Sequence, residues 1–301
     1  MKIVLFGPDK RTGVLSDDTV VDISLAFAKY LRERDGEADP VRLAEALVPA
    51  ELGRFIAGGP RVLENAEKAL GHLFGGADNP LGARGERLVH PVGEVTLHAP
   101  RPLGARVACA GGNFADHAAA MAARSAGRGE AHDDLGDNLS QAHDKIRETG
   151  IWGFWKVHRE STPPGGEVIY PARAKRLDYE GELAIVIGKQ GKDIDAADIL
   201  DYVWGVTLLG DWSIRLASEG GMLKFATQKN FDTSCSIGPC IAVGEADPFN
   251  AEVETLVNGE RRQHFNTKDM VFSFGEYLAH LSKDFTFYPG DMISGGTAAG
   301  T

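Results

Sequence analysis

Three acidic residues lie in or beside strongly apolar sequence and could together bind a metal ion. The stretch DYEGELAIVIGK, residues 178–189, is apolar on both faces when it is read as a strand, yet it begins with Glu180 and Glu182 on one face. Asp211 ends a second apolar run, in LLGDW. Burying these carboxylates without compensation would cost several kcal/mol each, so we expect a cation. Ligands that are all oxygen favour a hard ion, and we predict Mg²⁺, or Mn²⁺ or Ca²⁺, bound by Glu180, Glu182 and Asp211.

The alternative is that the two glutamates line a strand edge, where they lie in water or pair with Lys175 and Arg176. The E-x-E pattern alone is a weak signal. Asp211 and the motifs described below are what favour a metal site over this alternative. Three carboxylates around a six-coordinate divalent ion would leave about three positions for water and a bidentate substrate.

The elements that must position these acids are mostly strands. From residue 150 onward the segments expected as strands are GFWKVH, EVIYP, GELAIVIG, YVWGVTLLG, SIGPCIAVG, VETLVNGE and DMISGG. Only residues 195–203 and 270–284 have a clear helical pattern in this part of the chain. Because no repeated βαβ pattern is present, we expect an α+β fold that is mainly β.

The first hundred residues are patterned differently. KIVLF and TVVDIS are expected as strands, while residues 24–34 and 40–74 have helical spacing of apolar side chains. We therefore predict a small N-terminal α+β domain over residues 1–100 and a larger domain over 101–301. Within the larger domain, residues 106–124 read as a strand, a glycine turn and a helix capped by Asn113 or Asp116. The polar run from 125 to 149 is expected as a surface insertion, part helix, that could act as a mobile lid.

Composition excludes several classes of function. The chain has 301 residues, 43% of them hydrophobic, and 32 basic against 43 acidic residues give a formal net charge of −11. This charge argues against general binding to nucleic acid or to anionic membranes. The sequence has no long apolar run and three cysteines without a paired motif, so we expect a soluble, cytoplasmic protein with reduced thiols. The last residues are small and end abruptly, and we expect the natural polypeptide to continue past Thr301.

The order of motifs from about residue 106 to 301 resembles the fumarylacetoacetate hydrolase superfamily. The motifs that carry the resemblance are AGGNFADHA, FWK, LDYEGELAIVIGK, LGDWSIR, KNFDTSCSIGPCI, TLVNGERRQ and YPGDMISGGTAAGT. The resemblance implies that family's mixed β-roll/β-sandwich domain, with a small N-terminal domain and a homodimeric assembly. It also implies that Glu180, Glu182 and Asp211 are the ligands of the divalent metal ion.

The resemblance further implies a catalytic role for His117, as the group that activates water or moves a proton. Many relatives carry a glutamate three residues after this histidine, but this chain has Ala120 there. Asp116 is adjacent to His117 but points elsewhere on a helix. Glu130 or Glu148, in the polar run, could fold back over the site and supply the missing acid.

Other candidate residues follow from the resemblance. Lys229 matches a family lysine near the metal and is expected to take part in catalysis. Arg215 matches an arginine that binds a substrate carboxylate, with a structural ion pair as the alternative. Lys156 could approach the ligand or pack across the aromatic residues before it. Thr297 and Gly296 lie in a turn whose hydroxyl and backbone could donate to a ligand oxygen.

Taken together, these features favour a metal-dependent hydrolase that cleaves a C–C bond in a small 1,3-diketo or 2-oxo acid through an enolate. A decarboxylase or a tautomerase could use the same metal site and the same enolate. A relative that binds metal and ligand without turnover is the alternative of a different class, and Ala120 is the reason to consider it.

Overall fold

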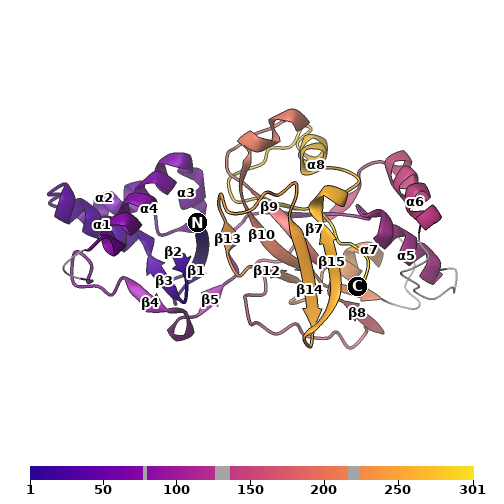
Figure 1. Cartoon of the computed structure of the whole chain (residues 1–301), viewed down its shortest axis with the longest axis horizontal. Coiled ribbons are helices and arrows are strands. Elements are labelled where there is room, and N and C mark those ends of the chain that lie inside the picture. The colour runs from indigo at the N-terminus through magenta and orange to yellow at the C-terminus, as the bar shows by residue number, and fades with distance from the viewer. Residues whose placement is uncertain (77–79, 126–135, 216–223) are drawn as a thin grey trace.

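A large mixed sheet runs through the computed structural model, which describes residues 1–76, 80–125, 136–215 and 224–301 (Figure 1). Its twelve strands follow the order β4-β3-β2-β1-β13-β10-β9-β16-β6-β7, with β12 paired to β10 and β5 paired to β1. Because β1 (Lys2–Phe6) is antiparallel to β13 (Ile241–Ala242), the sheet continues from the N-terminal part into the C-terminal part.

The N-terminal part combines short strands with helices that stack on one side of them (Figure 1). Besides β1, its elements are β2 (Arg11–Ser16), β3 (Thr19–Asp22), α1 (Ile23–Arg34), α2 (Pro40–Leu47), α3 (Leu52–Ala57), α4 (Gly59–Phe74), β4 (Val89–Pro91), η1 (Val92–Glu94) and β5 (Leu97–His98). Asp22 begins α1 as its N-cap, since its side chain accepts a hydrogen bond from Leu25 N at 3.1 Å. The strands and helices expected in this part of the chain are confirmed.

The C-terminal part is built around β9 (Gly181–Ile187), between β10 (Val203–Asp211) and β16 (Met292–Ser294). The remaining elements are β6 (Val107–Ala110), α5 (Ala115–Ser125), α6 (Gly136–Thr149), β7 (Gly153–Lys156), β8 (Arg176–Asp178), η3 (Ala196–Asp201), β11 (Ser213–Arg215), α7 (Lys224–Lys229), β12 (Cys235–Ile237), β14 (Glu252–Val257), β15 (Glu260–Asn266), η4 (Thr267–Asp269) and α8 (Phe274–Leu281). In the described residues the sheet is mixed, and the α+β fold expected from the sequence is confirmed.

Strand β9 is apolar on both faces because two hydrophobic clusters cover it. Ala184 and Val186 belong to a cluster shared with the N-terminal helices, whereas Leu183, Ile185 and Ile187 belong to a second cluster that includes residues of α8. The alternation of β9 side chains therefore matches the expected pattern. It places Glu182 on the face of Ala184 and Val186.

A β-hairpin lies outside the large sheet. Strands β14 and β15 pair antiparallel around Asn258 and Gly259, whose φ angles are 53° and 81°. Two successive positive φ angles match the turn type that favours Asn-Gly in hairpins. The sequence analysis expected β14 but not β15, although the Asn-Gly pair was the signal for both strands.

Two expectations about local structure differ from the fold. The segment EVIYP (167–171) is not a strand: Ile169 and Tyr170 are exposed, and Ile169 N donates to Thr233 Oγ1 at 2.8 Å instead of joining a ladder. Residues 196–201 form a 3₁₀ helix rather than an α-helix.

The polar run from 125 to 149 is partly described. From residue 136 it is the helix α6, which is anchored by buried Ile146 and by an Arg147–Glu276 ion pair with N–O distance 2.6 Å. The part-helix expectation is confirmed, while residues 126–135, including Glu130, lie outside the described residues. Among the described residues, none of the helices combines the length and apolar character needed to cross a membrane. Cys109, Cys235 and Cys240 form no disulfide.

Candidate metal centre

The three carboxylates expected to bind a metal converge at one end of the antiparallel β9–β10 pair, where β9 starts and β10 ends. Glu182 lies in β9 opposite Leu209 of β10, and Asp211 is the last residue of β10. One carboxylate oxygen from each of Glu180, Glu182 and Asp211 lies within 4.8 Å of the other two. The three residues are only 2%, 2% and 0% exposed. This is the spacing and burial that a single hard cation requires.

Glu180 reaches this position by a different route from the one expected. It precedes β9 rather than lying in it, and its φ of 43° is in the left-handed region. Its carbonyl still accepts a hydrogen bond from Asp211 N at 3.0 Å, which keeps it beside the end of β10. Simple strand alternation therefore explains Glu182 but not Glu180, whose left-handed backbone is strained for a residue with a side chain.

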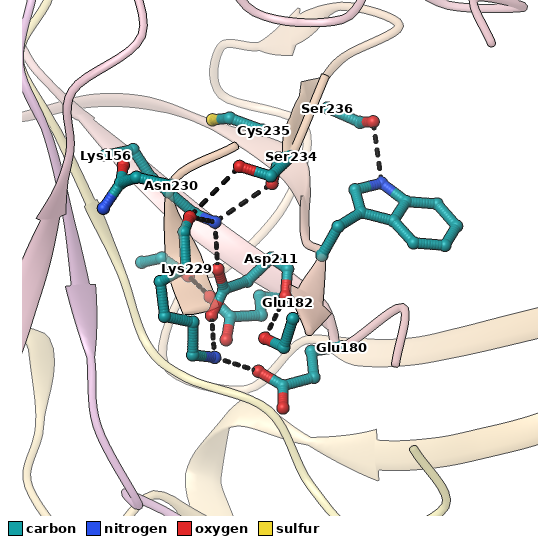
Figure 2. Close-up of polar contacts among 12 residues, drawn as sticks. Lys156, Glu180, Glu182, Asp211, Lys229, Asn230, Ser234, Cys235 and Ser236 are labelled. Atoms are coloured by element: carbon teal, nitrogen blue, oxygen red, sulfur yellow. Dashed lines mark hydrogen bonds and ion pairs between the residues drawn. The ribbon is translucent and has the colours of Figure 1, made fainter. Parts of the chain in front are cut away.

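Lys229 lies between two of the carboxylates. Its ammonium contacts Glu180 and Asp211, and Figure 2 shows it reaching between them from the end of α7. Burial would lower the pKa of Lys229, but the charges of Asp211 and Glu180 outweigh burial and raise it. Lys229 therefore stays protonated near neutral pH and can act as a fixed positive charge, not as a base.

Lys156 lies against Asp211, and its expected role in binding substrate stays a prediction. Its fully buried ammonium contacts the Asp211 carboxylate and donates to the carbonyls of Lys229 at 2.6 Å and Ser234 at 3.0 Å (Figure 2). An ammonium has three protons, and these three acceptors account for them. Lys156 therefore holds Asp211 in place from behind.

Arg215 forms the structural ion pair that was the alternative to substrate binding. Its Nε donates to Asp178 Oδ2 at 2.7 Å, and its Nη2 contacts Glu180. Strand β11, which carries Arg215, is paired with β8, which carries Asp178. The guanidinium thus compensates the charge of Glu180.

Glu182 has a weaker set of partners than the other two acids. In the described part of the chain it accepts a hydrogen bond from the Ser294 hydroxyl and forms no ion pair. Burial and the neighbouring Asp211 raise the pKa of Glu182 well above its ordinary value. At Glu180, burial also favours the neutral form, but Lys229 and Arg215 outweigh it and lower the pKa. A divalent ion would supply the positive charge that Glu182 lacks, so the donor set fits one.

His117 lies in the first turn of α5 and is partly buried near these charges. Burial lowers its pKa below the ordinary value of 6.5, and Arg215 and Lys229 add to this effect. No side chain among the described residues forms a hydrogen bond with its imidazole. Asp116 instead accepts hydrogen bonds from the backbone N–H groups of His117 at 2.6 Å and Ala299 at 3.3 Å. Glu148 is exposed on α6 and does not pair with His117.

The turn that contains Gly296 and Thr297 packs against the start of β9. The Thr297 hydroxyl donates to Gly181 O at 2.9 Å, so its proton is not directed to a ligand as expected. Gly296 has a φ of 89°, and a Cβ there would lie 3.3 Å from Ala110 O, so the turn requires glycine.

Three residues that hold this region together were not singled out in the sequence analysis: Ser294, Gln263 and Asn113, the last proposed only as a helix cap. Asn113 Nδ2 donates to the carbonyls of Phe272 and Gly295, both at 2.9 Å, and does not cap α5. All three lie inside the motifs quoted above, so the family resemblance was the signal that could have found them.

The chain is similar to known proteins in sequence and in fold. The family model described as fumarylacetoacetate (FAA) hydrolase C-terminal matches residues 106–301. Oxaloacetate tautomerase YisK of Bacillus subtilis (strain 168) is 31% identical over 291 residues, which cover 95% of this chain and 84% of that protein. A mitochondrial oxaloacetate tautomerase of Homo sapiens is 33% identical over 257 residues, covering 84% of this chain and 70% of that protein.

Among solved structures, maleylpyruvate hydrolase from Sphingobium sp. SYK-6, in complex with manganese(II) ion and pyruvate, is similar over the whole chain. The TM-score is 0.65 at 25% identity, and the match covers 100% of this chain and 89% of the other. Family model, relatives and fold agree, and the chain belongs to the fumarylacetoacetate hydrolase family.

Proposed function

We propose that this chain is a divalent-metal-dependent tautomerase that interconverts the keto and enol forms of a small 2-oxo dicarboxylic acid of the oxaloacetate type. The observation that carries the proposal is a buried triad, Glu180, Glu182 and Asp211, next to a histidine with no carboxylate partner among the described residues. Relatives that match most of the chain are named oxaloacetate tautomerases.

The triad would hold one Mg²⁺ or Mn²⁺ ion. When bound, such an ion draws electron density from the substrate oxygens and so makes the carbon-bound proton beside the carbonyl more acidic. Lys229 adds a permanent positive charge beside Glu180 and Asp211.

His117 would carry the proton between the carbon beside the carbonyl and the carbonyl oxygen of the substrate. Because burial lowers its pKa, the imidazole is neutral near pH 7 and can accept a proton. The proton leaves the carbon beside the carbonyl, the carbon–hydrogen electron pair forms the C=C bond, and the carbonyl oxygen gains a proton to become the enol hydroxyl. Tautomerisation needs one acid–base group and no activated water. This requirement matches His117, because the position three residues after it is Ala120 and not a glutamate.

Hydrolysis of a C–C bond, the reaction favoured by the sequence analysis, is the second candidate. The similar solved structure is a maleylpyruvate hydrolase with manganese(II) and pyruvate, which supports it. Hydrolysis is more demanding for His117, because the histidine must activate water without an acid to orient it.

A homodimer, a cytoplasmic location and a role as a non-catalytic binder all stay predictions.

The test is turnover by protein freed of metal with EDTA and then supplied with Mg²⁺ or Mn²⁺. Loss of the ultraviolet absorbance of enol-oxaloacetate would report tautomerisation, and maleylpyruvate and acylpyruvates would be assayed in parallel for cleavage. We expect metal-dependent tautomerisation that exceeds cleavage. Faster cleavage than tautomerisation would favour the hydrolase, and metal binding without any turnover would favour a binding protein.

A further inference from the structure

The hairpin β14–β15 packs against the backbone of Gly181, where its residue Gln263 forms hydrogen bonds. This residue of β15 is 1% exposed. Its Oε1 accepts a hydrogen bond from Gly181 N at 3.0 Å, while its Nε2 donates to Thr297 Oγ1 at 2.8 Å and to Ala298 O at 2.9 Å. The partners determine the orientation of the amide, because the Gly181 N–H can only donate and the Ala298 carbonyl can only accept.

These hydrogen bonds form a closed ring around one residue. The Thr297 hydroxyl, which accepts from Gln263, donates in turn to Gly181 O at 2.9 Å. Both backbone polar groups of Gly181 are therefore held by the ring. Gly181 is the residue between Glu180 and Glu182, so the ring fixes the backbone from which two of the three triad side chains extend.

The backbone next to this ring is strained and tightly packed. The left-handed φ of 43° at Glu180 is strained for a residue with a side chain and persists only where the surroundings enforce it. The hairpin lies directly against the same backbone, since a Cβ at Gly181 would be 2.1 Å from Thr255 Oγ1. The ring and this packing together are the surroundings that enforce the conformation of Glu180.

We propose that Gln263 is a positioning residue, which keeps the Glu180–Gly181 backbone in the conformation in which Glu180 and Glu182 share one divalent ion. The inference rests on the proposed function, because it takes the triad as the metal ligands. Among the described residues, the side chain of Gln263 forms hydrogen bonds with Gly181, Thr297 and Ala298 and with none of the triad carboxylates. Without its amide, Gly181 loses the partner of its N–H, Glu180 can relax toward an ordinary backbone conformation, and the two carboxylates move apart.

The test compares the affinity for Mn²⁺ of EDTA-treated wild type, Gln263→Met and a control, measured by electron paramagnetic resonance of the free ion. Methionine keeps the volume of glutamine but none of its hydrogen bonds. The control is Asn266→Ala, three residues along β15, where Asn266 Nδ2 donates to Asn250 Oδ1 at 3.0 Å. The control weakens the hairpin without touching the ring. We expect Gln263→Met to bind Mn²⁺ about 10–100-fold more weakly, as for residues that orient metal ligands, and Asn266→Ala to bind like wild type.

A second variant at the same position controls for misfolding of Gln263→Met. Gln263→Asn keeps a buried amide but is one methylene too short to reach Gly181 and Thr297 together, and we expect it to lose affinity in the same direction. Wild-type affinity in Gln263→Met or Gln263→Asn would overturn the inference, and so would an equal loss in Asn266→Ala. Wild type that binds no Mn²⁺ would overturn the proposed function and the inference with it.

Discussion

Two of the places where the described residues bury charge, the N-terminal pair Lys29–Glu33 and the triad of the metal centre, differ in their balance of charge. In the N-terminal helices, Lys29 is 1% exposed and its Nζ donates to Glu33 at 2.5 Å. Glu33, whose side chain is 38% exposed, also has His72 Nε2 at 2.7 Å. The hydrogen bond from Lys29 is the largest influence on the pKa of Glu33 and lowers it. This carboxylate is charged and compensated without any further ion.

The triad at the start of β9 and the end of β10 is not balanced in this way. Lys229 and Arg215 compensate Glu180, and Lys156 and Lys229 compensate Asp211. Glu182 has the Ser294 hydroxyl instead of a cation. A buried carboxylate without a compensating charge lowers stability unless a ligand supplies the missing charge. The difference favours the triad over the N-terminal pair as the place for a metal ion.

The largest expected effect comes from removing the unbalanced carboxylate. Glu182→Gln should lower metal-dependent turnover by more than about 100-fold, because it removes a ligand rather than a residue that orients one. Glu33→Gln is the matched control in the balanced cluster, and its turnover should equal that of wild type. Steady-state kinetics of both variants over a range of Mg²⁺ concentrations would check this. Equal turnover in the two variants would remove the distinction between the clusters.

The next effect concerns the proton carrier beside the triad. His117→Asn should lower kcat by about 10²–10⁴-fold while leaving Mn²⁺ affinity unchanged, since His117 moves a proton and binds no metal. In wild type, the rate should fall on the acid side as His117 becomes protonated, at a pH below 6.5 because burial lowers its pKa. Retained kcat in the variant, or an acid limb above this pH, would contradict the assignment.

A smaller effect separates the two buried lysines. Lys156→Met should reduce the free energy of unfolding by about 3–5 kcal/mol, because it leaves Asp211 buried without the cation behind it. Lys29→Met should cost less, since Glu33 is partly exposed and can be solvated. Urea denaturation of the metal-free proteins would measure both. The reverse order would mean that the site is better compensated than the N-terminal pair.

The smallest effect is that the contributions of Glu182 and Glu33 to folding stability change with pH in opposite directions. The pKa of Glu182 is raised in the folded state, so its contribution to stability is fully present below the unfolded pKa, about 4.3, and is lost as pH rises through the folded pKa. The pKa of Glu33 is lowered, so its contribution is present above the unfolded pKa and is lost as pH falls through the folded pKa.

Melting temperatures across this pH range would separate the two contributions. Without metal, Glu182→Gln should remove the loss of stability toward higher pH, and Glu33→Gln should reduce the loss toward lower pH. Mg²⁺ should raise the melting temperature of wild type most at high pH, because Glu182 must be ionised to bind the ion. A melting temperature of wild type that is indifferent to Mg²⁺ at every pH would contradict the account.

Sequence patterns predicted those parts of the fold and site that depend on local periodicity. Alternation along β9 placed Glu182 correctly, and the apolar run before Asp211 predicted its burial. The left-handed backbone of Glu180 could not be predicted, because the neighbouring Gly181 is held by Gln263 and Thr297, which lie far away in sequence.

The errors have the same origin in tertiary contacts. EVIYP has the composition of a strand, but no neighbouring strand pairs with it in the described structure, and strand propensity depends on such partners. The contacts of Lys156 with Asp211 and two backbone carbonyls could not be predicted either, since these partners lie far away in sequence.

The most direct test of the central claim is an anomalous difference map at the manganese absorption edge, from crystals of the EDTA-treated protein soaked in Mn²⁺. The account predicts one strong peak in contact with the carboxylates of Glu180, Glu182 and Asp211, and its loss in crystals of Glu182→Gln. A map with no peak among these three side chains, or a peak that persists in the variant, would contradict it.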